Sequence, residues 1–505
     1  MTPSPRESSP KVFCATLGCD KNLVDSEALL GKFALQGVTA VNEPEDADIW
    51  ILNSCGFIDA ARSDSAETLQ QMVDMKEGQT LVVCGCWSQE HGDMIQKNYP
   101  GVDIVAGVGQ FDRVVAACLD HEVSGPSSPA ARPASDFPLA GPPIVDPPME
   151  VHYTGMVDRP LLTPGHLAFV KIGEGCNFNC AFCRIPMIRG KQRSRPVAEI
   201  VTEVHNLVSR GVREIQIVSQ NTSDYGRDSG ENLHQLVTAL HEVDDLQRIR
   251  LLYIYAGVVS VEDLLRLLEM PKVAHYLDIP VQHASPRLLK AMKRPGGPES
   301  NARFFAALRR EHPDLVLRST ALLGFPGEED EDVSRLADFL AEVEFDHLGT
   351  YRYSPEEGTS AARLSGEVPP EVIMDREAII MDLQADISLR RQERRLGQTH
   401  SVVIDQVMTR DEAEDEGLED MVASFGDGLW TPGSSVASMD RHLAGEGTLA
   451  VGRSYHFGYD LDGVVLLPGA GLAAGQWIEA AFRGVTPHDV WAEPVVGQER
   501  MHRAE

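Results

Sequence analysis

The stretch GEGCNFNCAFCRIP, residues 173–186, determines how the central part of this chain is interpreted. It places Cys176, Cys180 and Cys183, here called the loop cysteines, in a C-x3-C-x2-C spacing, and the glycines and polar residues around them indicate a loop. Three thiolates this close together are soft ligands of the kind that hold iron–sulfur clusters. A [4Fe-4S] cluster held by only three cysteines keeps one iron open for a substrate. The alternatives are a zinc site, which usually has four protein ligands in paired C-x2-C motifs, and chance clustering.

The whole chain has the composition of a globular protein of about three or four domains. It has 505 residues, of which 43% are hydrophobic and 24% are charged. Its formal net charge of −31 argues against tight binding of nucleic acid, because such binding needs Lys and Arg to neutralise phosphates. A basic partner fits this charge better. We find no apolar run long enough for a membrane span and no signal-peptide pattern, so we expect a cytoplasmic protein.

The N-terminal part of the chain, residues 11–123, alternates short apolar runs with helical patterns, which predicts an open parallel α/β domain. We expect strands in KVFCATLGC, ADIWILNSCG and TLVVCGCW. DSEALLGKFALQG is expected to be a helix with Asp25 or Ser26 as its N-cap and Gly37 at its end. Residues 1–10 are expected to be disordered.

The chain has nine cysteines, which in a reducing cytosol indicate metal or redox chemistry rather than disulfides. Three of them, Cys19, Cys55 and Cys86, each follow a predicted strand and are here called the strand-end cysteines. The carboxyl ends of parallel strands meet at one edge of a sheet, so these thiols are predicted to form a second three-cysteine cluster. Cys84 competes for the third place, but Cys86 lies further along, in a turn position like the other two.

The segment 124–164 is rich in proline and is expected to be a semi-extended linker. Residues 165–398 then repeat strands and helices in about six units, fewer than the eight of a complete barrel. We therefore expect an open or partial (βα) barrel. Its first strand leads into the loop cysteines, which would place them at the carboxyl-terminal mouth, where barrel active sites lie.

The last part of the chain is predicted to be all β. A long amphipathic helix over 376–398 leads to residues 399–485, whose short apolar runs separated by Gly, Pro and Asp indicate a small β-barrel, and 486–505 are expected to be a tail. From His400 onward there are 18 acidic residues, six arginines and no lysine. This barrel is therefore poorly suited to RNA phosphates and better suited to a basic protein. The acidic block 411–420 is either a solvated loop or a surface that steers a basic substrate.

Five further stretches carry a family resemblance: LGCDKNLVDSE (17–27), NSCGFI (53–58), VSQNTSDYG (218–226), YLDIPVQHAS (276–285) and GFPGE (324–328). With the loop cysteines, they resemble the methylthiotransferases, radical SAM (S-adenosylmethionine) enzymes with two [4Fe-4S] clusters and a C-terminal TRAM domain of OB-like fold. The resemblance covers residues 11–485. Within this family the chain is most similar to the members that modify a ribosomal protein. The tRNA-modifying relatives typically read Gly-Cys-Gln-Met-Asn where this chain has Gly-Cys-Asp-Lys-Asn, residues 18–22.

The resemblance implies that a methylthio group is added to the β-carbon of one aspartate in ribosomal protein twelve of the small subunit. One SAM would donate a methyl group to sulfur. A second would bind the open iron of the cluster on the loop cysteines and be cleaved to a 5′-deoxyadenosyl radical, while the cluster on the strand-end cysteines would hold the sulfur. The reaction would also need an electron donor, such as flavodoxin or ferredoxin, and a sulfur donor.

Candidate SAM contacts follow the predicted strands at the barrel mouth. They are Phe182 beside the last loop cysteine, Ser219, Gln220 and Asn221, then Gln282 and His283, and finally Gly324, Gly327 and Glu328. Polar side chains here would bind the methionine amino or carboxylate group, and glycines would allow close approach of the adenosine. The pair Gln282 and His283 has an alternative role as a satisfied polar cap of a strand.

A basic run follows the loop cysteines: Arg189, Lys191, Arg193 and Arg195. It is either a solvated surface or a contact for the SAM carboxylate or the substrate. The chain also departs from its relatives at GRSYHFGYDLDG, residues 452–463, which lacks the Ala-Pro-Glu usual in the TRAM domain of this family. This departure bears on how a substrate docks.

Two other functions remain open. A tRNA adenosine methylthiotransferase would use the same chemistry, but residues 18–22 and the acidic C-terminal part disfavour it. A non-catalytic iron–sulfur scaffold on the ribosome would use the small barrel for binding alone. Such a scaffold would not cleave SAM, whereas an enzyme would.

Overall fold

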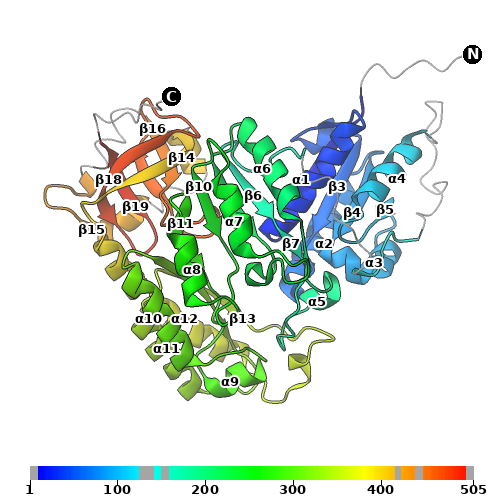
Figure 1. Cartoon of the computed structure of the whole chain (residues 1–505). Coiled ribbons are helices and arrows are strands. Elements are labelled where there is room, and N and C mark those ends of the chain that lie inside the picture. The colour runs from blue at the N-terminus through cyan, green and yellow to red at the C-terminus, as the bar shows by residue number, and fades with distance from the viewer. Residues whose placement is uncertain are drawn as a thin grey trace, which may run out of the picture.

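The computed structural model of the protein describes residues 9–123, 142–148, 158–415, 422–437, 439 and 447–495. Three units follow each other along the chain: an N-terminal parallel sheet, a larger central parallel sheet and a small C-terminal barrel (Figure 1). Most of the segments expected to be a disordered N-terminus, a linker and a tail lies outside the described residues. Among the helices of the described part, none combines the length and apolar character needed to cross a bilayer.

The N-terminal unit is an open parallel α/β sheet, which confirms the predicted fold class. Its strand order is β2-β1-β3-β4-β5, and every neighbouring pair is parallel. Its elements are β1 (Lys11–Thr16), α1 (Asp20–Leu35), β2 (Thr39–Ala40), β3 (Ile49–Ser54), α2 (Asp59–Met75), β4 (Thr80–Gly85), α3 (Cys86–Asn98), β5 (Ile104–Val105) and α4 (Phe111–Val123). Ile51 and Val82 face α1 and α4, whereas Leu52 and Val83 face α2 and α3. Both faces of the sheet are covered, so β3 and β4 are continuous apolar runs.

Helix α1 begins directly after its N-cap residue Cys19, so the prediction that Asp25 or Ser26 caps the helix is wrong. Asp25 lies inside the helix and is buried, where it pairs with Lys171 and Arg189 of the central unit. Its carboxylate therefore makes a tertiary contact, which local capping rules do not anticipate.

Part of the expected linker is built into the fold, so a plain linker is the wrong description of it. Ile144 forms a parallel bridge with Ala106 and extends the edge of the N-terminal sheet beyond β5. Arg159 is fully buried and pairs with Glu27 of α1 and with Glu203 of the central unit. These buried charges hold the two units together.

The central unit is an open parallel sheet of six strands, which confirms the expected partial barrel. Its strand order is β6-β9-β10-β11-β12-β13. Its elements are β6 (Leu167–Lys171), β7 (Gly173–Glu174), α5 (Ile185–Ile188), β8 (Arg193–Ser194), α6 (Val197–Ser209), β9 (Glu214–Val218), α7 (Leu233–His241), β10 (Arg248–Leu251), α8 (Val261–Leu268), β11 (Val273–Asp278), α9 (Pro286–Ala291), α10 (Pro298–Glu311), β12 (Val316–Leu323), α11 (Asp330–Val343), β13 (His347–Arg352) and α12 (Pro370–Glu393). Val170 and Ile217 pack against the surrounding helices. Phe169 and Val218 lie in a second apolar cluster with residues of α1, so the N-terminal unit packs on the other face of this sheet.

The C-terminal unit is a five-stranded barrel, as expected for an OB-like fold. The barrel strands have the order β14-β16-β17-β19-β18, β14 closes the barrel by pairing with β18, and the short β15 pairs with β18 at its edge. Its elements are β14 (Thr399–Thr409), α13 (Arg410–Asp415), β15 (Leu429–Trp430), β16 (Thr448–Arg453), β17 (Val465–Pro468), β18 (Trp477–Val485) and β19 (Val490–Pro494). Strand β19 lies beyond residue 485, so the predicted end of the barrel is too early. Its sequence VWAEP is too short to show a strand pattern, and its pairing with β17 and β18 identifies it.

The stretch 452–463, where the sequence departs from its relatives, joins the barrel to the central sheet. Asp462 accepts hydrogen bonds from the Tyr276 hydroxyl on β11 at 2.6 Å and from Arg318 on β12 at 3.2 Å. Arg453 donates to Glu214 on β9 at 3.1 Å. Burial opposes ionisation of Glu214, but the arginines around it, Arg453 foremost, lower its pKa to about 2. This stretch therefore has a structural role between the two units.

Candidate active site

The strand-end cysteines lie at one edge of the N-terminal sheet. Cys19 caps α1, Cys55 follows β3 and Cys86 begins α3. Gly18 has a positive φ of 93°, and a Cβ there would lie 2.9 Å from the Cys55 Sγ, so this turn requires glycine. Burial raises the pKa of Cys86 to about 12, Arg189 opposes that rise, and the thiols of Cys19 and Cys55 add to it. The three thiols are therefore close enough to interact electrostatically.

Cys84 belongs to a different environment from that of Cys86. It packs in an apolar cluster with Cys118 and the partly buried Cys14. Burial raises its pKa well above the usual value, and the Cys14 thiol adds to the rise. The side chain of Cys84 is therefore part of the core of the unit, and the geometry favours Cys86 as the third member of the strand-end set.

The strand-end set has the chemistry that an iron–sulfur cluster needs. Cys19 and Cys86 lie at the N-terminal ends of helices of 16 and 13 residues, where the helix dipole favours a thiolate. Arg189 donates hydrogen bonds to the Cys86 Sγ. Positive charge and hydrogen bonds to sulfur stabilise cluster ligands, so these residues fit the group that the family resemblance implies.

The loop cysteines lie between β7 and α5, beyond the carboxyl end of β6. The backbone N–H of Phe178 donates to the Cys176 Sγ at 3.4 Å, and that of Ile185 donates to the Cys183 Sγ at 3.5 Å. Phe182 packs in an apolar cluster with residues of α9 and β12, which anchors the end of the loop. Burial raises the pKa of Cys176 to about 11 and that of Cys183 to about 12. A metal group, which this donor set suits, would favour the thiolate form of both.

Tyr255, which the sequence reasoning did not select, lies against the loop cysteines. Its ring stacks on Phe178, with centroids 4.4 Å apart and an angle of 10° between the planes. Its hydroxyl lies 3.7 Å from the Cys180 Sγ. Arg294 lies over the same ring, 3.8 Å from its centroid, and donates to the Cys180 Sγ at 3.8 Å. Tyr255 follows β10, and a place soon after a strand is the signal that could have found it, whereas Arg294 has no such signal.

The candidates Ser219, Gln220 and Asn221 follow β9 and lie beside the loop. The Gln220 side chain accepts from the Gly175 N–H at 2.9 Å and donates to Glu174 at 2.7 Å, so it holds the loop in place. The Ser219 hydroxyl accepts from the backbone N–H of Asn221 at 3.1 Å. The Asn221 Nδ2 is buried and has no hydrogen-bond partner within the described ranges. Asn221 is therefore the one of these three with a buried donor that a ligand would satisfy.

The candidates His283 and Glu328 lie next to each other at the barrel mouth. The His283 Nδ1 accepts from the backbone N–H groups of Ala284 and Ser285 at 2.9 and 3.0 Å, which assigns the proton to Nε2. That Nε2 is buried and lies 3.5 Å from Glu328 without a hydrogen bond to it, whereas Glu328 accepts from Arg376 at 2.9 Å. His283 therefore keeps a buried donor that a ligand would satisfy, and the alternative of a fully satisfied polar cap is not supported within the described residues.

The remaining candidates lie where the backbone takes a positive φ: 69° at Gln282, 77° at Gly324 and 81° at Gly327. Gln282 is half-buried, and its backbone N–H donates to Thr320 at 2.8 Å. A Cβ on Gly324 would lie 2.3 Å from the Ile373 side chain of α12. The packing of α12 therefore accounts for the glycine at 324 without any ligand.

Two members of the basic run are buried, so a solvated surface is wrong for Arg189 and Arg195. Arg195 pairs with Glu203 at 2.7 Å. Lys191 is exposed and Arg193 is half-buried. The run therefore divides between structural ion pairs and the surface.

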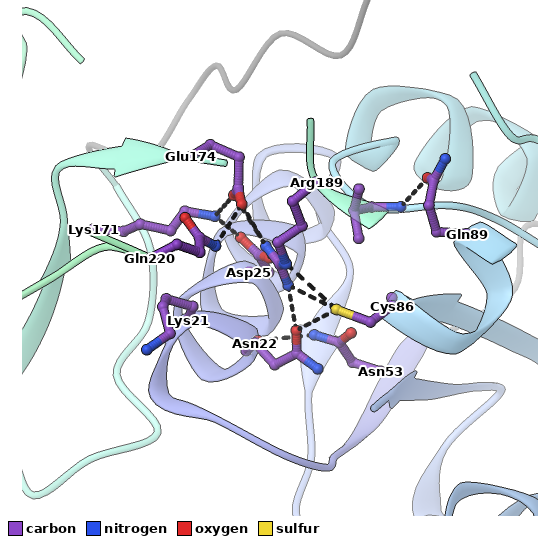
Figure 2. Close-up of polar contacts among 12 residues, drawn as sticks. Lys21, Asn22, Asp25, Asn53, Cys86, Gln89, Lys171, Glu174, Arg189 and Gln220 are labelled. Carbon is purple, nitrogen blue, oxygen red and sulfur yellow. Dashed lines mark hydrogen bonds and ion pairs between the residues drawn. The ribbon is translucent and has the colours of Figure 1, made fainter. Parts of the chain in front are cut away.

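Arg189 is the centre of a buried polar network that includes the Cys86 Sγ (Figure 2). Its Nη1 donates to Asp25 and to Glu174, each at 3.0 Å, and its Nη2 donates to Asn22 at 2.5 Å. Lys171 donates to Glu174 at 2.9 Å and also pairs with Asp25. Burial opposes ionisation, but Arg189 and Lys171 hold the pKa of Glu174 well below its usual range. Sequence reasoning missed Glu174 and Lys171, because Lys171 pairs with Asp25, 146 residues away, and Glu174 accepts from Gln220, 46 residues away.

Comparisons with known proteins agree with the division into units. Residues 11–107 match the model of an uncharacterized protein family, UPF0004, and residues 170–340 match that of the radical SAM superfamily. A ribosomal protein uS12 methylthiotransferase RimO of Alkalilimnicola ehrlichii is 36% identical over 96% of this chain and 98% of its own length. A second, of Symbiobacterium thermophilum, is 35% identical over 96% of this chain and 90% of its own length.

Among solved structures, the radical SAM methyltransferase TsrM of Kitasatospora setae covers 68% of this chain and 73% of its own. The TM-score is 0.49 and the identity 14%, a likeness too weak to carry an argument. The sequence relatives match along nearly the whole chain at a much higher identity. The chain therefore belongs to the family of RimO-type ribosomal protein uS12 methylthiotransferases, which are radical SAM enzymes.

Proposed function

We propose that this protein transfers a methylthio group to the β-carbon of one aspartate of uS12, the small-subunit ribosomal protein twelve. The observation that carries the proposal is the pairing of two three-cysteine sites, joined by the Arg189 network, in a chain similar to RimO along nearly its whole length. A ribosomal substrate implies that the protein acts in the cytoplasm.

Two [4Fe-4S] clusters would serve this reaction. The loop cysteines would hold one, called the loop cluster, which would bind SAM. The strand-end cysteines would hold the other, called the strand-end cluster, which would carry the sulfur. With SAM, the loop cluster supplies homolytic hydrogen abstraction, which suits a carbon too weakly acidic for a side-chain base.

The residues around the loop cluster would orient SAM and exclude water. Tyr255 and Phe178 form a stacked apolar wall beside the loop cysteines, and Arg294 places a positive charge over it. Gln220 fixes the loop through Gly175. Of the predicted SAM contacts, Asn221 and His283 have the best support, because the Asn221 Nδ2 and the His283 Nε2 are buried and lack a hydrogen-bond partner within the described residues.

The partners follow from the chemistry and the charge. Reductive cleavage of SAM requires an external electron donor, such as flavodoxin or ferredoxin, and repeated turnover requires a sulfur donor. The excess of acidic residues in the C-terminal part favours a basic ribosomal protein over RNA. Because of this charge, we regard tRNA adenosine as a less favoured substrate than uS12.

The test is reaction of the anaerobically reconstituted protein with SAM, reductant, sulfide and either purified uS12 or unmodified tRNA. We expect 5′-deoxyadenosine and a methylthio group on uS12, and unchanged tRNA. Modified tRNA with unchanged uS12 would support the second substrate instead. Absence of SAM cleavage, with both clusters loaded, would support the non-catalytic scaffold.

A further inference from the structure

Arg189 belongs to the central unit, yet it makes its closest sulfur contact with a cysteine of the N-terminal unit. Its Nη2 lies 3.2 Å and its Nε 3.4 Å from the Cys86 Sγ. Both N–H groups donate to the sulfur, and the Arg189 side chain is only 2% exposed. A paired donation of this kind uses the planar fork of arginine, which lysine does not have.

The orientation of Arg189 is fixed by partners on both units. Asp25 and Asn22, both on α1, accept from its Nη1 and Nη2. Glu174, on β7, accepts from its Nη1. Nε, Nη1 and Nη2 all donate to acceptors within the protein. Arg189 is therefore a poor candidate for binding SAM or the substrate. These contacts instead direct its guanidinium towards the sulfur of Cys86.

The same contacts lead to the loop cysteines. Glu174 lies two residues before Cys176 and accepts from Gln220 at 2.7 Å. Gln220 in turn accepts from the backbone N–H of Gly175. A continuous set of hydrogen bonds therefore runs from the Cys86 Sγ through Arg189 to the residue before the first loop cysteine.

We propose that Arg189 is a positioning residue of the strand-end cluster, which holds Cys86 in its ligand geometry and raises the reduction potential of that cluster. This proposal rests on the proposed function, because it requires that cluster. Hydrogen bonds to sulfur and a nearby positive charge stabilise the more negative, reduced state of an iron–sulfur cluster. Partners that orient a metal ligand also tune the metal group that it holds.

The test compares Arg189→Lys with Arg159→Lys in the full chain. Arg159 is a matched control, because it is also fully buried and also pairs with acidic residues of α1 and the central unit, Glu27 and Glu203. In a background with the loop cysteines replaced by alanine, the strand-end cluster is the only one present. Its potential is then measured by redox titration followed by electron paramagnetic resonance.

We expect Arg189→Lys to shift the potential of the strand-end cluster to a more negative value and to change its resonance spectrum, because the fork on Cys86 is lost. Arg159→Lys should leave both unchanged. A double variant, Arg189→Gln with Glu174→Gln, removes the arginine together with the Glu174 carboxylate, while Asp25 keeps its pair with Lys171. It should also give a negative shift, because the donors and the positive charge that lie closest to the Cys86 Sγ are lost.

An unchanged potential and spectrum in the Arg189 variants, or an equal shift in Arg159→Lys, would overturn the proposal. Selective loss of the strand-end cluster from the Arg189 variants, with Arg159→Lys fully loaded, would support the holding role. The proposed function is tested separately, by measuring whether the unsubstituted protein modifies uS12. Failure there with a shifted potential would reject the substrate and retain the role of Arg189.

Discussion

Arg62 of α2 donates a 2.6 Å hydrogen bond to Glu356, so an ion pair joins the N-terminal unit to the segment after β13. Glu356 also accepts from the backbone N–H of Asp59 at the start of α2, at 2.9 Å. Its side chain is 2% exposed, and it lies 3.6 Å from Arg184, which directly follows the last loop cysteine. The contact therefore ties α2 to the region of the loop cysteines.

Replacement of Glu356 with Gln should loosen this connection. We expect faster hydrogen exchange in α2, equivalent to a loss of about 1–3 kcal/mol, because buried donors lose a charged acceptor. The control is Glu377→Gln, since the 2.6 Å pair of Arg352 with Glu377 lies within the central unit and is partly exposed. Equal exchange of α2 in both variants would show that Glu356 does not hold the units together.

Replacement of single cysteines should show whether Cys86 or Cys84 is the third ligand of the strand-end cluster. We expect Cys86→Ala to lose about half of the bound iron after reconstitution, because one of two similar clusters is lost. Cys84→Ala should retain its iron and its activity, since Cys84 packs in the apolar core. Iron and sulfide analysis of both variants measures this. The reverse pattern would assign the ligand to Cys84.

Replacement of Gly324 with Ala tests whether that glycine serves packing or SAM binding. The new methyl group would meet the Ile373 side chain, so we expect a loss of about 1–3 kcal/mol of stability. The double variant Gly324→Ala with Ile373→Ala should recover part of that loss, because space is restored. Unfolding and SAM affinity are measured on both. A fall in SAM affinity without loss of stability would instead indicate a ligand contact.

The stability of the C-terminal barrel should fall in mild acid. His400, on β14, packs against His456 and Phe482, with ring centroids 4.6 Å away in each case. Burial, and then the charge of Arg395, lower the pKa of His400 from 6.5 to about 4, against a small opposing effect of Asp314. Protons therefore bind the unfolded chain more tightly. The stability that neutral His400 contributes to the folded state is fully present above pH 6.5 and is lost as the pH falls from 6.5 towards 4.

Urea unfolding at a series of pH values measures this effect. His400→Phe keeps the ring packing and removes the titrating group, so its midpoint should fall less between pH 7 and pH 5 than that of the unsubstituted protein. His205→Gln is the control, because His205 is exposed on α6. An unchanged slope in His400→Phe would show that other groups cause the acid sensitivity.

The order of the three units along the chain could be predicted from the sequence, and so could the place of the strand-end cysteines at one edge of the N-terminal sheet. Strand patterns are local, and parallel topology then brings the residues after different strands to one edge, as with Cys19 and Cys55. The loop cysteines needed only their own spacing. Strand β19 and the bridge at Ile144 escaped prediction, because pairing with distant strands, rather than local pattern, defines them.

The network around Arg189 could not be predicted for the same reason. Asp25 and Arg189 are 164 residues apart, and neither residue carries a local sign of its partner. Similarly, the role of Gly324 depends on Ile373 of α12, and the unpartnered Nε2 of His283 is apparent only from its tertiary surroundings. The sequence therefore located the candidate site, whereas the tertiary contacts distinguish structural from ligand-binding residues within it.

The most direct test of the central claim is intact-protein mass spectrometry of small-subunit ribosomal proteins from cells that have or lack this gene, with nucleoside analysis of their tRNA. We predict a methylthio increment on uS12 that disappears without the gene, returns with the unsubstituted gene and does not return with Cys183→Ala. An unaltered uS12 mass in cells that lack the gene would contradict the account, and a changed tRNA nucleoside in the same cells would identify the other substrate.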